Sequence, residues 1–116
     1  MITLRQGLLC IYIALTAVAA NAQTINLTGQ EWLGNLKLSD AELDAVKIAI
    51  QKSLEAPIDA EQQCGENRMD CVVRSAREWT VDGERYREVV IDIHGRGHAS
   101  QTVAQTGGQW PEIVTK

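Results

Sequence analysis

The chain has 116 residues, 22% of them charged, and a formal net charge of −4. Because nucleic-acid binding needs a concentrated basic surface, this acidic balance argues against DNA or RNA as a partner. The length allows one small domain, close to the lower limit for a self-sufficient hydrophobic core.

The N-terminal segment has the pattern of a secretory signal peptide. Arg5 precedes an apolar run from Leu8 to Ala20, and Ala20-Asn21-Ala22 supplies small residues at both positions needed for cleavage after Ala22. The alternative is an uncleaved membrane anchor, but the run falls short of the roughly 20 apolar residues that a spanning helix needs. We expect residues 1–22 to be removed, with no stable membrane insertion afterwards. Residues 23–116 would then form a single small exported domain, periplasmic or secreted.

A weak helix signal follows in the exported part. Thr28-Gly29-Gln30-Glu31 has the capping-box pattern and precedes apolar residues between positions 32 and 36. Gly34 weakens this helix. We therefore expect a short first helix, and residues 24–28 could serve as an extended lead-in to it.

The strongest helix signal lies between Asp40 and Glu55. Ser39 is a suitable N-cap, Glu42 completes a capping box, and Pro57 disfavours continuation of the helix. The apolar residues that recur at helical spacing are Leu43, Val46, Ile50 and Leu54. A membrane-surface role is the alternative, but the polar face lacks the cationic excess that such helices use. The pattern predicts an amphipathic helix that covers a hydrophobic core.

Two cysteines remain once Cys10 is removed with the signal peptide. In an oxidising compartment, Cys64 and Cys71 are expected to form a disulfide. The bridge would close a loop of about eight residues and stabilise the fold by roughly 2.5 kcal/mol on chain-entropy grounds. A redox pair or a thiol metal site is the alternative, but their spacing differs from that of thioredoxin-like and zinc-binding motifs.

After Cys71 the sequence changes to β character. Residues 72–81 and 85–94 alternate in hydrophobicity and are joined by Asp82-Gly83, the strongest hairpin signal in the chain. In the first strand, Val73, Trp79 and Val81 are expected to lie on one face, and in the second strand Val89, Ile91 and Ile93 are expected to point toward the core. The pattern predicts an antiparallel hairpin.

Two further segments extend this hairpin. Residues from His98 to about Thr106 are small and polar, which favours an exposed edge strand. Residues 110–114 form either a short fourth strand or an anchoring tail. The expected fold class is therefore α+β, with one amphipathic helix packed on a three- to four-stranded antiparallel meander and one tryptophan in the core. This architecture is similar to that of cystatin-like and PepSY-like domains.

Both histidines lie beside one turn. If residues 95–97 form a three-residue loop, His94 and His98 face each other across the strands, and Asp92 points the same way. These three side chains could bind Zn²⁺ or Cu²⁺, or the histidines could respond to pH near 6. An ordinary surface turn is the alternative. We predict no catalytic residue, because Ser100 lies in a plain strand without a nucleophile elbow.

A second candidate site lies across the predicted hairpin. Arg85 and Arg87 stand close to acidic residues, which favours cross-strand ion pairs on a solvated face. The functional alternative is a site for an anionic ligand or a sugar, in which Trp79 or Tyr86 stacks on the ligand.

The sequence thus favours a small exported binding protein without enzymatic activity. An inhibitor or a host-contact factor fits this class, and its partner would be a protein or a glycan outside the cytoplasm. No cofactor is required. The alternative is a metal-binding or pH-sensing envelope protein that uses His94 and His98.

Overall fold

The structure is a computed structural model that describes residues 24–64 and 70–115. The predicted signal peptide, including Cys10, lies outside the described residues. The elements in chain order are β1 (Thr24–Asn26), the 3₁₀ helix η3 (Glu31–Leu36), α1 (Asp40–Glu55), β2 (Gln62–Gln63), β3 (Cys71–Val81), β4 (Glu84–Ile93), β5 (Gly97–Ala104) and β6 (Glu112–Val114).

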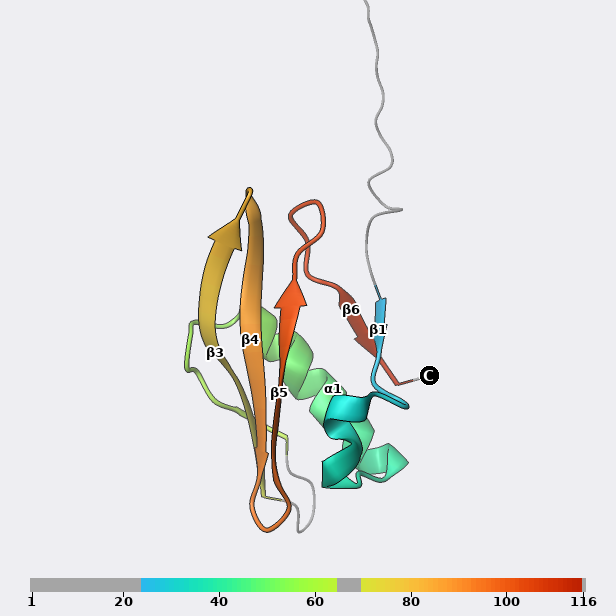
Figure 1. The fold of residues 1–116 in the computed structure, drawn as a ribbon. Helices are drawn as coiled ribbons and strands as arrows, with labels where there is room; N and C mark the ends of the chain where they lie inside the picture. The colour runs from blue at the N-terminus through green and yellow to red at the C-terminus, as the bar shows by residue number, and fades with distance from the viewer. Residues whose placement is uncertain (1–23, 65–69, 116) are drawn as a thin grey trace, which may run out of the picture.

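The described residues form an α+β fold, as expected. Strands β2, β3, β4 and β5 make an antiparallel sheet in that order, and α1 packs on one of its faces (Figure 1). β2 joins the sheet although no strand was predicted at these residues. β6 does not extend this sheet but pairs in parallel with β1. Within the described residues, no helix is long and apolar enough to span a membrane.

The main helix begins and ends where the sequence predicts. The Ser39 N–H donates to a Glu42 carboxylate oxygen at 2.9 Å, and the Glu42 N–H donates to the Ser39 hydroxyl oxygen at 3.2 Å. These two bonds form the predicted capping box, which satisfies amide groups that have no partner inside the helix. The helix ends at Glu55, two residues before Pro57.

The first helix differs from its prediction in type and in its cap. Glu31–Leu36 is a 3₁₀ helix, and its N-cap Gln30 makes no side-chain capping bond. The predicted capping box at Thr28 is wrong, because the Thr28 hydroxyl donates instead to the Thr115 carbonyl at the other end of the chain. The extended lead-in is confirmed in part by β1.

The hydrophobic core lies between α1 and the sheet. Val46, Ile50 and Leu54 from the helix belong to the same buried cluster as the three inward residues predicted for β4, which are Val89, Ile91 and Ile93. Trp32 and Trp110 pack against this cluster and remain partly exposed. The sequence predicted one tryptophan in the core, and the structure instead has these two at its margin.

A β-bulge in β3 reverses the predicted direction of two side chains. Ser75 pairs with Val89 while Arg77 already pairs with Glu88, so Ala76 is an extra residue in the strand. After the bulge, each side chain points to the face opposite to the one that a regular alternating strand would predict. Trp79 and Val81 therefore lie on the outer face, away from buried Val73, and the prediction that all three share one face is wrong.

The predicted turn between β3 and β4 is confirmed. Val81 pairs with Glu84, which leaves Asp82 and Gly83 as a two-residue loop. Both have a positive φ, 51° and 83°, as a type I′ turn requires.

Candidate functional site

The outer face of the sheet, turned away from α1, carries several of the predicted site residues. Directly opposite residues in an antiparallel pair point to the same face. The pairs Val72 with Asp92 and Trp79 with Tyr86 alternate with pairs whose side chains face the helix. Figure 1 shows α1 and the β1–β6 pair on the other side of the sheet.

Trp79 and Tyr86 form an aromatic pair on this face. Their rings stack with centroids 5.9 Å apart and planes inclined by 9°. The Arg77 guanidinium lies over the Trp79 ring, 4.8 Å from its centroid, and donates to the Glu88 carboxylate at 3.0 Å. Both aromatic residues are only partly buried. The arrangement presents an aromatic surface beside a cation, which suits stacking and cation–π contacts with a partner.

The histidines lie at the other end of the outer face, in a register that differs from the prediction. Asp92 pairs with His98, and Ile93 pairs with Gly97, so the loop contains residues 94–96. The expected pairing of His94 with His98 is therefore wrong, because the loop begins one residue earlier than predicted and the partner of His98 is Asp92. Gly97 has φ 118°, a conformation that favours glycine, and this allows the strand to begin directly after the turn.

Asp92 and His94 line a shallow hollow of about 230 Å³ together with Glu61, Asp70 and Arg74. His98 is not part of this lining. Arg74 also makes an ion pair with Asp59 at 3.0 Å. Within residues 24–64 and 70–115, no three or more His, Cys, Asp or Glu side chains are grouped closely enough to hold a metal ion. The zinc or copper site stays a prediction.

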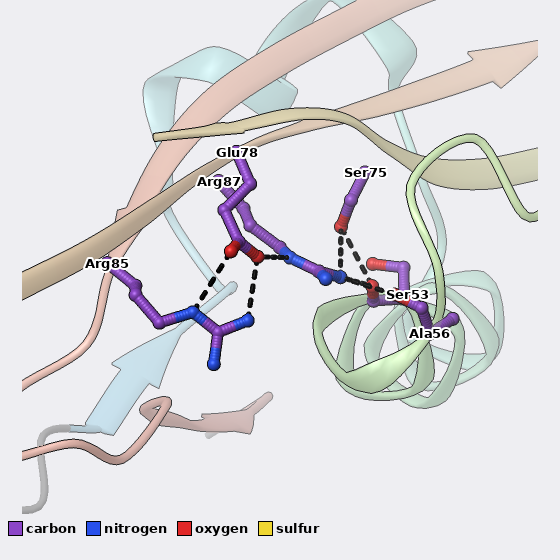
Figure 2. A network of polar contacts seen from close by, with 6 residues as sticks. All are labelled: Ser53, Ala56, Ser75, Glu78, Arg85 and Arg87. Atoms are coloured by element: carbon purple, nitrogen blue, oxygen red, sulfur yellow. Dashed lines mark hydrogen bonds and ion pairs between the residues drawn. The ribbon is translucent and has the colours of Figure 1, made fainter. Parts of the chain in front are cut away.

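Arg85 and Arg87 lie on the helix-facing side of the sheet, opposite Trp79 and Tyr86. Figure 2 shows both arginines converging on the Glu78 carboxylate. Arg85 makes two bonds to it, at 2.8 and 3.0 Å, and the Arg87 Nε donates to it at 2.7 Å. These charge-assisted bonds hold the pKa of Glu78 at about 2, the Arg85 bonds contributing most. The predicted cross-strand ion pairs are present, but the prediction of a solvated face is wrong for Arg87, which is buried on the helix-facing side.

Arg87 also caps the C-terminus of α1. Its Nη1 donates to the Ser53 carbonyl at 2.8 Å and to the Ala56 carbonyl at 2.6 Å, and the Ser75 hydroxyl donates to the same Ser53 carbonyl (Figure 2). These carbonyls lie at the negative end of the helix dipole, where a cation is favoured. Only 6% of Arg87 is exposed. These contacts and its burial therefore give Arg87 a structural role at the edge of the core.

A second arginine binds the N-terminus of the same helix. Arg96, in the turn after β4, makes a bidentate ion pair with Glu42, with N to O distances of 2.9 and 3.0 Å. This contact lowers the pKa of the Glu42 carboxyl and raises that of the Arg96 guanidinium. Both ends of α1 are thus held by arginines from β4 or its following turn.

The predicted disulfide joins Cys64 and Cys71, whose Cα atoms are 5.0 Å apart. Both residues are buried, and the Cys64 N–H donates to the Cys71 carbonyl at 2.9 Å. The bridge links the segment after β2 to the start of β3. It is consistent with an oxidising compartment.

The structure also contains a cleft between β5 and β1 that the sequence did not indicate. It is lined by Trp32 of η3 together with residues of β1 and β5, which only the tertiary arrangement brings together. The nearest signal in the sequence was the small and polar composition of residues 98–106, which predicted an edge strand but no cleft. The chain matches no known family model, no curated protein and no solved structure.

Proposed function

We propose that the protein is a non-enzymatic binding protein that acts outside the cytoplasm, in the periplasm or the medium. The observation that carries this proposal is the stacked pair of Trp79 and Tyr86 on the outer face of the sheet. Large aromatic side chains dominate the energetics of many recognition surfaces, and they bury much area at little entropic cost. The partner is a protein or a glycan, as for an inhibitor or a host-contact factor.

The surroundings of the aromatic pair support recognition over catalysis. Arg77 stands beside Trp79, and Val81, which is 48% exposed, extends the apolar surface toward the hairpin tip. A partner with an apolar or ring-shaped group could stack there, while an acidic or hydroxyl group could bond to the guanidinium. The Cys64–Cys71 disulfide and the predicted signal peptide support the compartment.

The test compares the exported, disulfide-bonded chain with the double variant Trp79→Ala/Tyr86→Ala. Each is immobilised and exposed to envelope extract and to a glycan array. Ile48→Ala is the matched control, because Ile48 is an exposed hydrophobic residue of α1, on the other side of the sheet. We expect a partner that the wild type and Ile48→Ala retain and the double variant loses. Equal retention by all three would reject the outer face as the binding surface.

A second proposal concerns metal binding at the other end of the outer face. It rests on the direct pairing of Asp92 with His98 across β4 and β5. A carboxylate and an imidazole on facing strands supply two ligands of the kind that zinc and copper accept. Calorimetric titration with Zn²⁺ and Cu²⁺ tests this. Stoichiometric binding that His98→Ala abolishes supports the site, and the absence of stoichiometric binding rejects it.

A further inference from the structure

A cleft of about 240 Å³ lies between the free edge of β5 and the β1 strand. Gln101, Thr102 and Val103 of β5 line one side, and residues 24–27 line the other. Ile50 and Val89, which belong to the core, also contribute to its lining. β5 ends the four-stranded sheet and β1 belongs to the two-stranded one, so the two strands are not paired with each other (Figure 1).

The main chain of β5 has unused hydrogen-bonding groups along this cleft. The Gln105 N–H donates to the Arg85 carbonyl at 2.8 Å. In an antiparallel pair, every second residue directs its main-chain N–H and C=O groups toward the neighbouring strand, so this bond shows which residues of β5 are bonded to β4. By this alternation, the N–H and C=O groups of Ser100, Thr102 and Ala104 point away from β4. Among the described residues, no hydrogen bond from outside the ladder reaches them. They form the edge onto which another strand can add.

The β5 edge also lacks the features that usually protect a sheet edge. Proteins commonly place charged residues or proline on exposed edge strands to prevent pairing with other chains. Gly97–Ala104 contains no Lys, Arg, Asp, Glu or Pro. By contrast, β3, where it extends beyond its short pairing with β2, carries Arg74, Arg77 and Glu78. The two edges of the sheet therefore differ, and among the described strands β5 lacks the charged residues that would hinder addition.

The lining of the cleft restricts the chemistry of its occupant. The residues that line it include no charged side chain, although 22% of the chain is charged. Burying an unpaired charge in such a place is costly, so an uncharged occupant is favoured. The volume is also below the roughly 300–1,000 Å³ of typical small-molecule sites. The cleft therefore suits one or two side chains of a longer segment.

We propose that an extended, uncharged segment of another protein adds to β5 as a further strand, with one of its side chains in the cleft. The main-chain groups of Thr102 would supply hydrogen bonds, and the cleft would supply selectivity, as in other cases of β-strand addition. A second copy of this chain is disfavoured, because its own β5 is flanked by β1 and η3. This site is separate from the outer aromatic face.

The test uses a displayed library of seven-residue random peptides, selected on the exported, disulfide-bonded chain. Synthetic versions of the enriched peptides are then measured by fluorescence titration. Thr102→Pro removes the edge N–H without breaking the ladder to β4, since that N–H points away from it. Thr102→Ala is the matched control, because it keeps the N–H. We expect Thr102→Pro to weaken binding about tenfold or more and Thr102→Ala to change it less than about threefold.

Two further measurements complete the test. Gln101→Glu places a charge in the cleft and is expected to weaken binding. Gln101 is exposed, so this variant serves as a test even if Thr102→Pro fails to fold. Gln101→Ala is its control. Hydrogen exchange of the Thr102 amide should slow in the complex. The proposal is overturned if no peptide is enriched, or if the folded variants bind as tightly as the wild type. It is also overturned if the wild type forms a dimer through β5 that Gln101→Glu dissociates.

Discussion

Arg87 is a charged residue whose contacts are made almost entirely inside the protein. Its guanidinium bonds at once to Glu78 and to the last carbonyls of α1. Burying a charge is costly unless it is paired and hydrogen-bonded, and here several partners meet that requirement. The partners would in turn be left unsatisfied if the arginine were removed.

Replacement of Arg87 should therefore destabilise the fold strongly. We expect Arg87→Met to lower the free energy of unfolding by about 3 kcal/mol, measured by urea denaturation at pH 7. Arg74→Met is the matched control, since Arg74 makes an exposed ion pair with Asp59. The control should cost less than about 1 kcal/mol. If Arg87→Met lowered the free energy of unfolding by no more than this control value, the helix cap would not be stabilising.

The Glu78 carboxylate gives a second prediction, on acid stability. Its pKa is about 2 in the folded protein, below the ordinary value of 4.5, so folding favours the ionised form. The resulting stability is fully present above pH 4.5 and is lost as pH falls toward 2. We expect a loss of about 1–2 kcal/mol, since partial exposure of the carboxylate screens its ion pairs.

This prediction is checked by urea denaturation at several pH values between 6 and 2. Glu78→Gln should be less stable than the wild type at pH 6 and should lose less stability on acidification. Some pH dependence should remain, because Arg96 also lowers the pKa of Glu42. A variant that follows the wild-type curve throughout would contradict the role given to Glu78.

At the scale of single elements, the disulfide fastens the start of β3 to the segment after β2. We expect Cys64→Ser/Cys71→Ser to lower the free energy of unfolding by about 2–3 kcal/mol, since the loop is short and both residues are buried. Thermal denaturation with circular dichroism measures the change. Reduction of the wild type should produce a similar loss, and an unchanged midpoint in both cases would refute a stabilising bridge.

The elements that depend on local sequence were the ones that could be predicted. The capping box and Pro57 define α1, and Asp82-Gly83 defines the turn between β3 and β4, because each acts within a few residues. The bulge at Ala76 could not be predicted, since nothing in its sequence differs from a regular strand. One extra residue was enough to move Trp79 to the other face.

The candidate sites were predicted less well for the same reason. Asp92 was expected to share a face with His98, and the two residues pair directly, but the register of the turn after β4 removed the expected pairing of His98 with His94. Arg87 was expected at the surface, and its role as a helix cap depends on an element 31 residues earlier in the chain. The cleft beside β5 depends on residues from several segments that lie far apart in the sequence.

At the scale of the whole molecule, the proposed export has a direct test. Mass spectrometry of the protein produced in a host with an intact secretion system should show a chain that begins at Gln23. Its mass should be lower by two hydrogens than that of the dithiol form, because Cys64 and Cys71 are joined. A full-length or fully reduced product would contradict both the compartment and the proposed setting of the binding function.

The two faces of the sheet carry residues with different roles in stability. The inner face holds the core and the Arg87 contacts, so changes there should alter stability. The outer face around Trp79 and Tyr86 takes no part in the core cluster, so changes there can alter recognition with little effect on folding. This separation makes the binding proposals testable with variants that remain folded.

The arginines that hold α1 also bear on the kinetics of folding. The helix has its own capping box, but its two ends are fixed by Arg87 and Arg96, which belong to β4 and the turn after it. We expect these long-range contacts to form late in folding, after the helix and the hairpin. Loss of Arg87 should therefore speed unfolding while leaving the refolding rate nearly unchanged.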